Sequence, residues 1–392
     1  MNPLPHCREI PRLTCALFGA IKAAATLKNT VILVHGPRGC VYHINYILGM
    51  RGDAHNPVYC TCMDEHDVVF GAEERLQNAI VELDGEKSPD IIVVLSCCAS
   101  GIIGEDVESA CRAAHTRAVI IPVDVGGFSG DFSTGYDRAL LAIVSRTAKK
   151  GVGKERGLVN LVGMMRGGPD LRGIKSLLAS LGVRVGTVIP AGASLEELEA
   201  CGRADYNILM CETAGTSAAR YLKETFQTEY IPVTFPVGVR LSSQFLNDVA
   251  GALGLPRPAP VTGECSARFP VKKDPRIAVF SGPTRATALF SFLSFHGLTP
   301  RMIVVDFESP LLSRLRDLVG AQCSILVSPS WEEIEEALVE HRVNLIVGGL
   351  MERSMATRLD IPLVDVMHGS QVTVGPGGEE NLLALIREGL DR

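Results

Sequence analysis

Three cysteines at glycine-containing turns in the first hundred residues are the side chains best suited to chemistry. Cys15 lies in T-C-A-L-F-G-A, Cys40 ends H-G-P-R-G-C, and Cys98 lies in S-C-C-A-S-G-I-I-G-E-D. Thiolates from separate turns can converge in space and hold iron and sulfide. The pattern therefore predicts an iron–sulfur cluster and a role in electron transfer.

The set of cluster ligands is incomplete, because an iron–sulfur cluster generally takes four thiolate-type ligands. The missing ligand could come from a neighbouring chain, from a carboxylate or from another cysteine. The other candidates in this part of the chain are Cys7, Cys60, Cys62 and Cys97. Adjacent residues of an extended segment point in opposite directions, so only one of Cys97 and Cys98 should be a ligand.

The turn that ends in Cys40 could instead hold a phosphate, since Gly36 and Gly39 permit a close approach of the backbone. The turn lacks both the Lys-Ser/Thr ending of a P-loop and a G-x-G-x-x-G fingerprint. We therefore favour thiolate ligation over nucleotide binding.

Composition limits the classes of partner. The chain has 392 residues, 46% of them hydrophobic, and a net charge of -6 with scattered basic residues, which argues against nucleic acid. Its start lacks the pattern of a signal peptide, and no run of about 18 uncharged apolar residues follows. We expect a cytoplasmic protein with no membrane partner, in which the 12 cysteines are thiols or metal ligands rather than disulfides.

Short runs rich in Val and Ile alternate with segments of helical period, and this pattern restarts three times. It predicts an α/β fold of three Rossmann-like, doubly wound parallel-sheet domains around a central cleft. We place a cluster-binding and docking domain at residues 1–150, a second domain at 151–272 and a third at 273–392. Lys149–Arg156 and Gly254–Asp274 are the expected connections.

The expected strands are Thr30–His35, Asp90–Ser96, Ala118–Val123, Leu158–Val162, Arg184–Ile189, Tyr206–Met210, Tyr230–Val233, Arg276–Phe280, Arg301–Val305, Ser324–Val327, Asn344–Val347 and Leu363–Val366. The expected helices include Leu17–Leu27, Ala72–Leu83, Glu105–Ala114 and Asp170–Leu181. Cys40, Cys98, Cys211 and His368 all follow expected strands. Ligands gather at the carboxyl ends of strands in such sheets, so we expect these four side chains to be functional.

Two groups near the cysteines have simpler interpretations. Glu105 and Asp106 follow Gly104 at the head of an expected helix, where capping explains both carboxylates first and tuning of the cluster second. His35, beside the glycine turn, is expected to hydrogen-bond the backbone rather than bind metal.

The order of these motifs resembles the nitrogenase component 1 superfamily. The resemblance is carried by Cys15, by Cys40, and by the segments Asp67–Ala72, Cys98–Asp106 and Gly127–Gly130. It implies that the three cysteines hold a P-cluster or a simpler 4Fe-4S cluster at a subunit interface. It also implies that an ATP-dependent iron protein docks near Asp67, Phe70 and Gly71.

Two later segments extend the resemblance. N-I-L-M-C, ending at Cys211, and I-P-L-V-D-V-M-H-G-S, containing His368, look like the segments that grip opposite ends of the nitrogenase active-site cofactor. The resemblance implies a second iron–sulfur cofactor on this cysteine and this histidine. The simpler interpretation is a buried apolar Cys211 and a hydrogen-bonded core His368.

The chain also departs from the dinitrogen-reducing pattern. Tyr136 follows the S-T-G turn where that pattern has a histidine proton donor, which makes it the candidate acid here. Thr213 replaces an expected arginine, and Gly369–Gln371 replaces an aromatic pair. Loss of a proton donor, a cation and two aromatic walls implies a substrate other than dinitrogen.

The resemblance implies the catalytic, electron-accepting subunit of a nitrogenase-like reductase, which works as a homodimer or as a heterotetramer with a second component 1 subunit. One alternative is a scaffold on which a nitrogenase-type cofactor is assembled. Another is a subunit of a tetrapyrrole reductase or cyclase. An iron-free α/β protein that binds a metabolite is the third.

Overall fold

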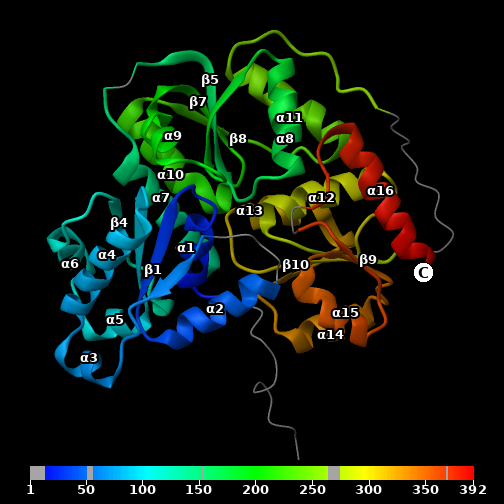
Figure 1. Cartoon of the computed structure of the whole chain (residues 1–392). Helices are drawn as coiled ribbons and strands as arrows, with labels where there is room; N and C mark the ends of the chain where they lie inside the picture. The colour runs from blue at the N-terminus through cyan, green and yellow to red at the C-terminus, as the bar shows by residue number, and fades with distance from the viewer. Residues whose placement is uncertain (1–13, 51–55, 152, 264–273, 368–369) are drawn as a thin grey trace, which may run out of the picture.

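The chain folds as three parallel sheets, each covered by helices (Figure 1). The computed structural model describes residues 14–50, 56–151, 153–263, 274–367 and 370–392. The first sheet and its helices lie at the lower left of Figure 1, the second at the top and the third at the right. Every strand pair within the sheets is parallel, so the expected fold class is confirmed.

The first sheet has the strand order β2-β1-β3-β4. Its strands are β1 (Thr30–His35), β2 (Val58–Cys60), β3 (Ile91–Ser96) and β4 (Val119–Val123). All residues of β1 and β3 are buried, because helices cover both faces of a parallel sheet and favour continuous Val and Ile runs. The strand β2, which has only 3 residues, all half-buried, was not expected from the sequence.

The second sheet has the order β6-β5-β7-β8 and the third the order β11-β10-β9-β12-β13. Their strands are β5 (Glu155–Met164), β6 (Arg184–Pro190), β7 (Ala204–Leu209), β8 (Glu229–Pro232), β9 (Ile277–Phe280), β10 (Met302–Val305), β11 (Ser324–Val327), β12 (Leu345–Gly348) and β13 (Leu363–Asp365). One expected connection was drawn too long, since β5 begins at Glu155, inside Lys149–Arg156. The charged residues Lys154 and Arg156 around the start of β5 have the composition of a loop, which is why the sequence pattern placed them in the connection.

The helices of the first unit are α1 (Ala16–Ala24), α2 (Arg38–Met50), α3 (Glu65–Phe70), α4 (Glu73–Lys87), α5 (Cys98–Ile103), α6 (Val107–Ala113) and α7 (Phe132–Thr147). Those of the second unit are α8 (Pro169–Ser180), α9 (Leu195–Glu199), α10 (Glu212–Phe226) and α11 (Gly238–Ala252). Those of the third unit are α12 (Pro283–Phe295), α13 (Leu311–Val319), α14 (Trp331–Glu340), α15 (Arg353–Arg358) and α16 (Gly375–Asp391). None of the described helices combines the length and apolar character needed to cross a membrane.

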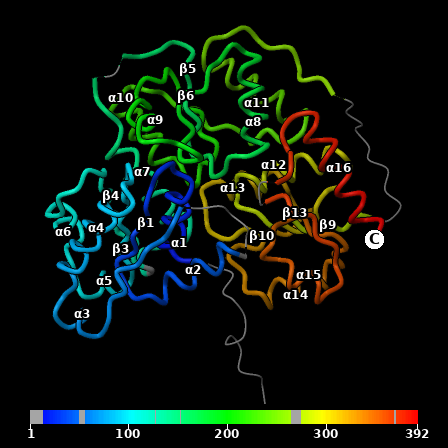
Figure 2. Tube along the Cα trace, viewed as in Figure 1, coloured from blue at the N-terminus to red at the C-terminus, as the bar shows by residue number. Residues whose placement is uncertain are grey.

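Helices α1 and α7 pack at very short range, and α7 also contacts α10 of the second unit (Figure 2). A Cβ atom at Gly135 of α7 would lie 1.8 Å from the Ala16 carbonyl oxygen. Only glycine permits this approach of two backbones. The crossing holds the start of α1, where Cys15 lies, against the start of α7.

The hydrophobic core does not stop at the borders between the sheets. One cluster of buried side chains runs from Val159 of β5 to Leu390 of α16, and α16 packs on α11 of the second unit. Another cluster joins the first sheet to one face of the second. Buried side chains on both sides of each border thus belong to shared clusters, and the expected domain borders near residues 150 and 272 stay a prediction.

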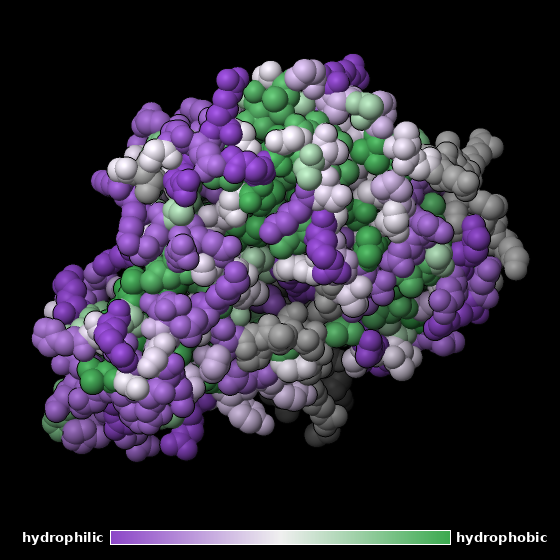
Figure 3. All heavy atoms as spheres, turned by 45° about the horizontal axis from the view of Figure 1, so that its top comes forward, coloured by the Kyte–Doolittle hydropathy of each residue, from purple (hydrophilic) through white to green (hydrophobic). Residues whose placement is uncertain are grey.

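The surface is largely hydrophilic around its rim (Figure 3). Hydrophobic residues show between the polar ones, mostly in the upper middle of the face drawn there. The apolar side chains that matter for the site are exposed on the first unit and are described below.

Candidate functional site

The first group of candidate residues lies at the point of the first sheet where the strand order reverses. The order reverses between β1 and β3, and Cys40 and Cys98 follow these two strands. The carboxyl ends of two neighbouring strands that lead to opposite sides leave a crevice between them, which is the usual ligand site of doubly wound sheets. The two cysteines therefore lie at one crevice.

Each of the three expected cluster cysteines lies at the start of a helix. Cys15 is the N-cap of α1, Cys40 lies in the first turn of α2, and Cys98 is the first residue of α5. Backbone N–H groups at helix starts are unpaired, so each of the three cysteines lies where donors for a negatively charged ligand are available. The sequence indicated turns here, and α2 was not foreseen because its apolar residues have no regular spacing.

The thiols of the first unit converge. A hydrogen bond with Cys97 raises the pKa of Cys40, and burial and the charges of Cys97, Cys98 and Cys15 raise it further. A Cβ atom at Gly36 would lie 2.2 Å from Cys97 Sγ, so the glycine turn is what admits this sulfur. Four thiols from three separate loops thus lie close enough to influence one another.

Cys97 and Cys98 differ in their surroundings. Cys97 is 1% exposed, and its sulfur accepts a hydrogen bond from the Ala99 backbone N–H at 3.3 Å. The hydrogen bond from Cys40, chiefly, lowers the pKa of Cys97 to about 6. Cys98 is half-buried, as is Cys40, whereas Cys15 is exposed. Cys98 therefore has the more accessible sulfur of the adjacent pair.

The donor set fits an iron–sulfur cluster by ligand type, since soft thiolates are the donors that such clusters take. Within the described part of the chain, no group of three His, Cys, Asp or Glu side chains is arranged to hold a single metal ion. A cluster spreads its ligands over several irons, so the two observations are compatible. No disulfide joins the described cysteines, and the role of Cys15, Cys40 and Cys98 as ligands stays a prediction.

The three expected docking residues differ in exposure. Phe70, at the end of α3, is 74% exposed, and Gly71 follows it with a φ of 88°. Asp67 is buried and completes the capping box of α3, and Arg75 Nε lies 3.2 Å from its carboxylate. Its carboxylate thus folds α3 rather than facing outward. Val69 and Ile102, which are 73% and 70% exposed, extend the apolar surface around Phe70 from the adjoining helices α3 and α5.

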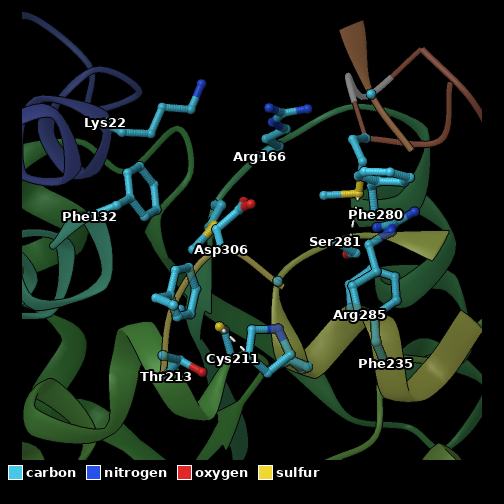
Figure 4. Close-up of a pocket in the computed structure, with 18 of the residues that line it drawn as sticks. Lys22, Phe132, Arg166, Cys211, Thr213, Phe235, Phe280, Ser281, Arg285 and Asp306 are labelled. Carbon is cyan, nitrogen blue, oxygen red and sulfur yellow. Dashed lines mark hydrogen bonds between the residues drawn. The ribbon is translucent and has the colours of Figure 1, made fainter. Parts of the chain in front are cut away.

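A cavity of about 320 Å³ lies between the three units (Figure 4). Its walls are mainly the segments that follow β5, β7, β9, β10, β12 and β13. Phe235 after β8, Ser328 after β11, Lys22 of α1 and the residues at the starts of α1 and α7 complete them. The second and third sheets reverse their order at β5/β7 and β9/β12, so the cavity joins two crevices of the same kind as the first. The expected central cleft is therefore present.

Cys211 lines this cavity at the carboxyl end of β7. Its sulfur lies 3.6 Å from Thr284 Oγ1, and burial raises the pKa of the thiol. Thr213, which replaces the expected arginine, lies 3.1 Å from Ser309 through the two hydroxyl oxygens. The position has thus become a neutral link between the second and third units.

Cationic side chains from all three units also line the cavity, namely Lys22, Arg166 and Arg285 (Figure 4). Arg285 lies 3.2 Å from Asp170 and 4.8 Å from the ring centre of Phe235. Its Nε is buried and has no hydrogen-bond partner among the described residues. Phenylalanine and methionine side chains form much of the remaining wall.

A family model described as Nitrogenase component 1 type Oxidoreductase matches residues 15–390. The chain belongs to this family. It is similar to the nitrogenase iron-molybdenum cofactor biosynthesis protein NifE of Clostridium pasteurianum, with 26% identity over 92% of this chain and 83% of that protein. It is also similar to one subunit of the light-independent protochlorophyllide reductase of Gloeothece citriformis, with 28% identity over 88% of this chain and 74% of that protein.

A comparison with solved structures supports the fold. A solved structure of nitrogenase Cp1 at pH 6.5 matches with a TM-score of 0.83 over 100% of this chain and 94% of that chain, at 18% identity. At that identity the match shows the fold. The expected membership of the superfamily is confirmed by the family model.

The two remaining residues expected from the family pattern are His368 and Tyr136. His368 lies outside the described residues, although the preceding Met367 lines the cavity and accepts a hydrogen bond from Ser281 Oγ at 3.4 Å. Tyr136 is 0% exposed and is not part of the cavity wall, and its hydroxyl has no partner among the described residues. Burial, and then the charge of Cys211, raises the pKa of Tyr136, so its proton is strongly held.

The cavity cations were not expected from the sequence. Arg166 and Arg285 each lie a few residues after a strand of the family fold, in M-M-R-G-G and G-P-T-R. Their place after strands β5 and β9 was the available signal, because side chains there point to the ligand crevice. Lys22 is the one charged residue of the otherwise apolar α1 and is 4% exposed, which was a second signal.

Proposed function

We propose that this chain is the catalytic, electron-accepting subunit of a nitrogenase-like reductase. It receives electrons from an ATP-dependent iron protein through an iron–sulfur cluster on Cys15, Cys40 and Cys98, and it reduces a substrate other than dinitrogen. The observation that carries this proposal is the convergence of thiols from three loops at one crevice of the first sheet. Family membership supports the reaction class.

A bound cluster would accept and release single electrons. The chain itself supplies the thiolates, the helix starts that favour their negative charge, and a buried sheet behind them. Cys15 is exposed, and Tyr42 and Tyr46 on the neighbouring helix α2 are 77% and 50% exposed. Such aromatic surface next to open ligands supports a partner chain, either a second copy of this one or a second component 1 subunit, that covers the cluster.

The exposed apolar patch of Val69, Phe70 and Ile102 is the proposed seat of the iron protein. Ile102 lies four residues after Cys98 in α5, and four residues of α-helix rise about 6 Å. Electrons that arrive at the patch would therefore start close to a cluster ligand. Short distance is the main requirement of the transfer.

The cavity is the proposed place of reduction. Cys15 pairs with Asp131 in an isolated antiparallel bridge, and Asp131 and Thr14 both line the cavity. Cys15, a proposed cluster ligand, is thus paired through its backbone with a residue of the cavity wall. The cavity is lined by both cations and carboxylates, the latter being Asp131, Asp170, Asp306 and Glu352, so it offers polar partners of either sign between its Phe and Met side chains.

Two kinds of ligand suit the cavity. Cys211 supplies a thiol that could anchor a second iron–sulfur cofactor together with His368. An organic substrate reduced in the cavity, as in the relatives named protochlorophyllide reductase, would need no such anchor. Tyr136 stays the proposed acid, and it would act only through a group placed between its buried hydroxyl and the cavity.

A scaffold for cofactor assembly is the second candidate function, because the chain is similar to a protein named for cofactor biosynthesis. Turnover separates the two. Anaerobically purified protein is mixed with its iron protein, ATP and dithionite, and electron consumption is measured with candidate substrates. We expect a brown protein that consumes electrons, whereas cluster transfer to an apo acceptor without turnover would favour the scaffold. A colourless, iron-free protein would contradict both.

A further inference from the structure

His35 is the last residue of β1 and directly precedes the turn that carries Cys40. Its side chain is 0% exposed, and its Nε2 lies 2.5 Å from Glu105 Oε2. Its Nδ1 lies 3.1 Å from Thr61 Oγ1, which also accepts a hydrogen bond from the Gly36 N–H at 3.1 Å. Because that oxygen accepts from Gly36, its own proton is available to His35 Nδ1, which leaves Nε2–H to donate to Glu105.

Glu105 links this histidine to the docking patch. Its other carboxylate oxygen accepts a hydrogen bond from the backbone N–H of Ala72, which follows α3 and Gly71. Its side chain is 4% exposed. The expectation that Glu105 caps a helix is wrong, because Asp106 caps α6 by accepting from the Ser109 N–H at 2.8 Å, while Glu105 turns back toward α3.

The second cysteine turn reaches the same histidine. Ser100 Oγ donates to the His35 carbonyl oxygen at 3.1 Å and accepts from the Cys97 backbone N–H at 2.9 Å. His35 is therefore linked by hydrogen bonds to Glu105 near the docking patch, to the turn that carries Cys40 and to the turn that carries Cys97 and Cys98. Such a network keeps one geometry, because breaking any link leaves a buried polar group unsatisfied.

We propose that Glu105 and His35 are positioning residues that hold the Gly36–Cys40 turn against the docking patch and so couple a docked protein to the surroundings of the cluster. The proposal rests on the proposed function for the identity of the cluster and of the docked protein. Its physical basis is independent of that function. It consists of an unbroken series of hydrogen bonds from Ala72 through Glu105, His35 and Thr61 to Gly36.

The test uses the anaerobically purified full chain and three variants. Glu105→Ala removes both bonds of the carboxylate. Glu105→Gln keeps an oxygen for Ala72, and its amide can donate to His35 Nε2 once the imidazole proton moves to Nδ1 and donates to Thr61 Oγ1, so it should rescue. Glu108→Ala is the matched control, since Glu108 is partly exposed on α6 and its carboxylate pairs with Arg112 and Arg146, away from the cysteine turns. Hydrogen exchange of peptides that cover Gly36–Cys40 is measured by mass spectrometry, and the EPR spectrum of the reduced cluster is recorded on the same samples.

We expect exchange in this turn to rise about tenfold or more in Glu105→Ala, with a changed EPR line shape at unchanged iron content. Glu105→Gln should recover most of the protection, and Glu108→Ala should match the parent. Parent-like exchange and EPR in Glu105→Ala would overturn the proposal. If that variant does not fold, Thr61→Val is used, and unchanged exchange there overturns the proposal equally. Iron-free parent protein would instead contradict the proposed function, and the exchange measurement would still decide the positioning role.

Discussion

Cys15 and Asp131 form an isolated antiparallel bridge that joins the start of α1 to the start of α7. The Ala16 N–H donates to the Gly130 carbonyl at 3.1 Å beside it. The first residue of the pair is a proposed cluster ligand, and the second lines the central cavity. This one contact therefore lies on a short covalent and hydrogen-bonded route between the two proposed redox sites.

Replacing Cys15, Cys40 or Cys98 singly with alanine should remove most of the iron and the cluster EPR signal, because each thiolate is proposed to bind iron directly. Cys323→Ala, in the third unit and 7% exposed, should keep both. Iron is measured by a colorimetric assay. Iron contents that equal the parent's in all three variants would remove the cluster assignment.

Replacing Phe70 with alanine should lower the rate of electron uptake from the iron protein by about tenfold or more, because truncation of a central aromatic contact typically weakens an interface by about 2 kcal/mol or more. The EPR spectrum of the isolated chain should not change. Val339→Ala is the control, since Val339 is 67% exposed on the distant helix α14. Equal rates in parent and Phe70→Ala would place the docking surface elsewhere.

Replacing Cys211 with alanine should abolish substrate reduction while the first cluster keeps its iron and its spectrum. The thiol lines the cavity and not the crevice of the first sheet, so the two sites should fail separately. Cys201→Ala, a buried cysteine of the same unit outside the cavity wall, should keep activity. Full turnover without the Cys211 thiol would favour an organic ligand that needs no metal anchor.

Replacing Gly135 with alanine should destabilise the chain by about 1–3 kcal/mol or more, because the new Cβ would overlap the backbone of α1. Gly85→Ala in α4 is the matched control, since no atom lies within 4 Å of its Cβ position, and it should stabilise slightly. Thermal unfolding followed by circular dichroism measures both. The close crossing of α1 and α7 would be wrong if both variants unfolded at the same temperature.

Asp84 provides a test of pH dependence away from the site. Its carboxylate accepts from the backbone N–H groups of Arg117 and Ala118 at 3.1 and 3.0 Å, and the bond from Arg117, chiefly, lowers the pKa of Asp84 below 3.8. Since the folded pKa is the lower one, the stabilisation is complete above the unfolded pKa and is lost as the pH falls through the folded value.

The melting temperature of Asp84→Asn should therefore lie well below that of the parent at pH 7, and the two should converge as the pH drops below about 3.8. Glu86→Gln, an exposed neighbour on α4, should show no such convergence. A difference between Asp84→Asn and the parent that is constant with pH would mean that the charge is not the cause.

The sequence predicted the strands well where burial is complete. All 6 residues of β1 are buried, and its bounds were predicted to the residue, because an unbroken apolar run between turns is a clear signal. The strand β2 was not predicted because it is too short, and the helix α2 was not predicted because its apolar face is irregular. Pairing with β1 and packing on the first sheet stabilise them, and a local pattern does not contain that information.

The site was predictable in part for the same reason. Cys40, Cys98 and Cys211 were proposed because each is a reactive residue after a strong strand, and their roles stay a prediction. Arg166 and Arg285 were missed, because an arginine in a glycine-rich loop has the same local appearance on a solvated surface as in a cavity. Only the meeting of loops from two sheets separates the two cases. Glu105 was misassigned on similar grounds, since its partners lie far from it in sequence.

The continuous buried cluster from Val159 to Leu390 has a consequence for how the protein unfolds. The second and third units share their interior, so heating should melt them in one cooperative step. In a fragment that ends near residue 272, the apolar side chains that pack on the third unit would be exposed to solvent, and we expect the fragment to aggregate. Any swap of parts between relatives should therefore exchange loops at strand ends and keep this pair of units whole.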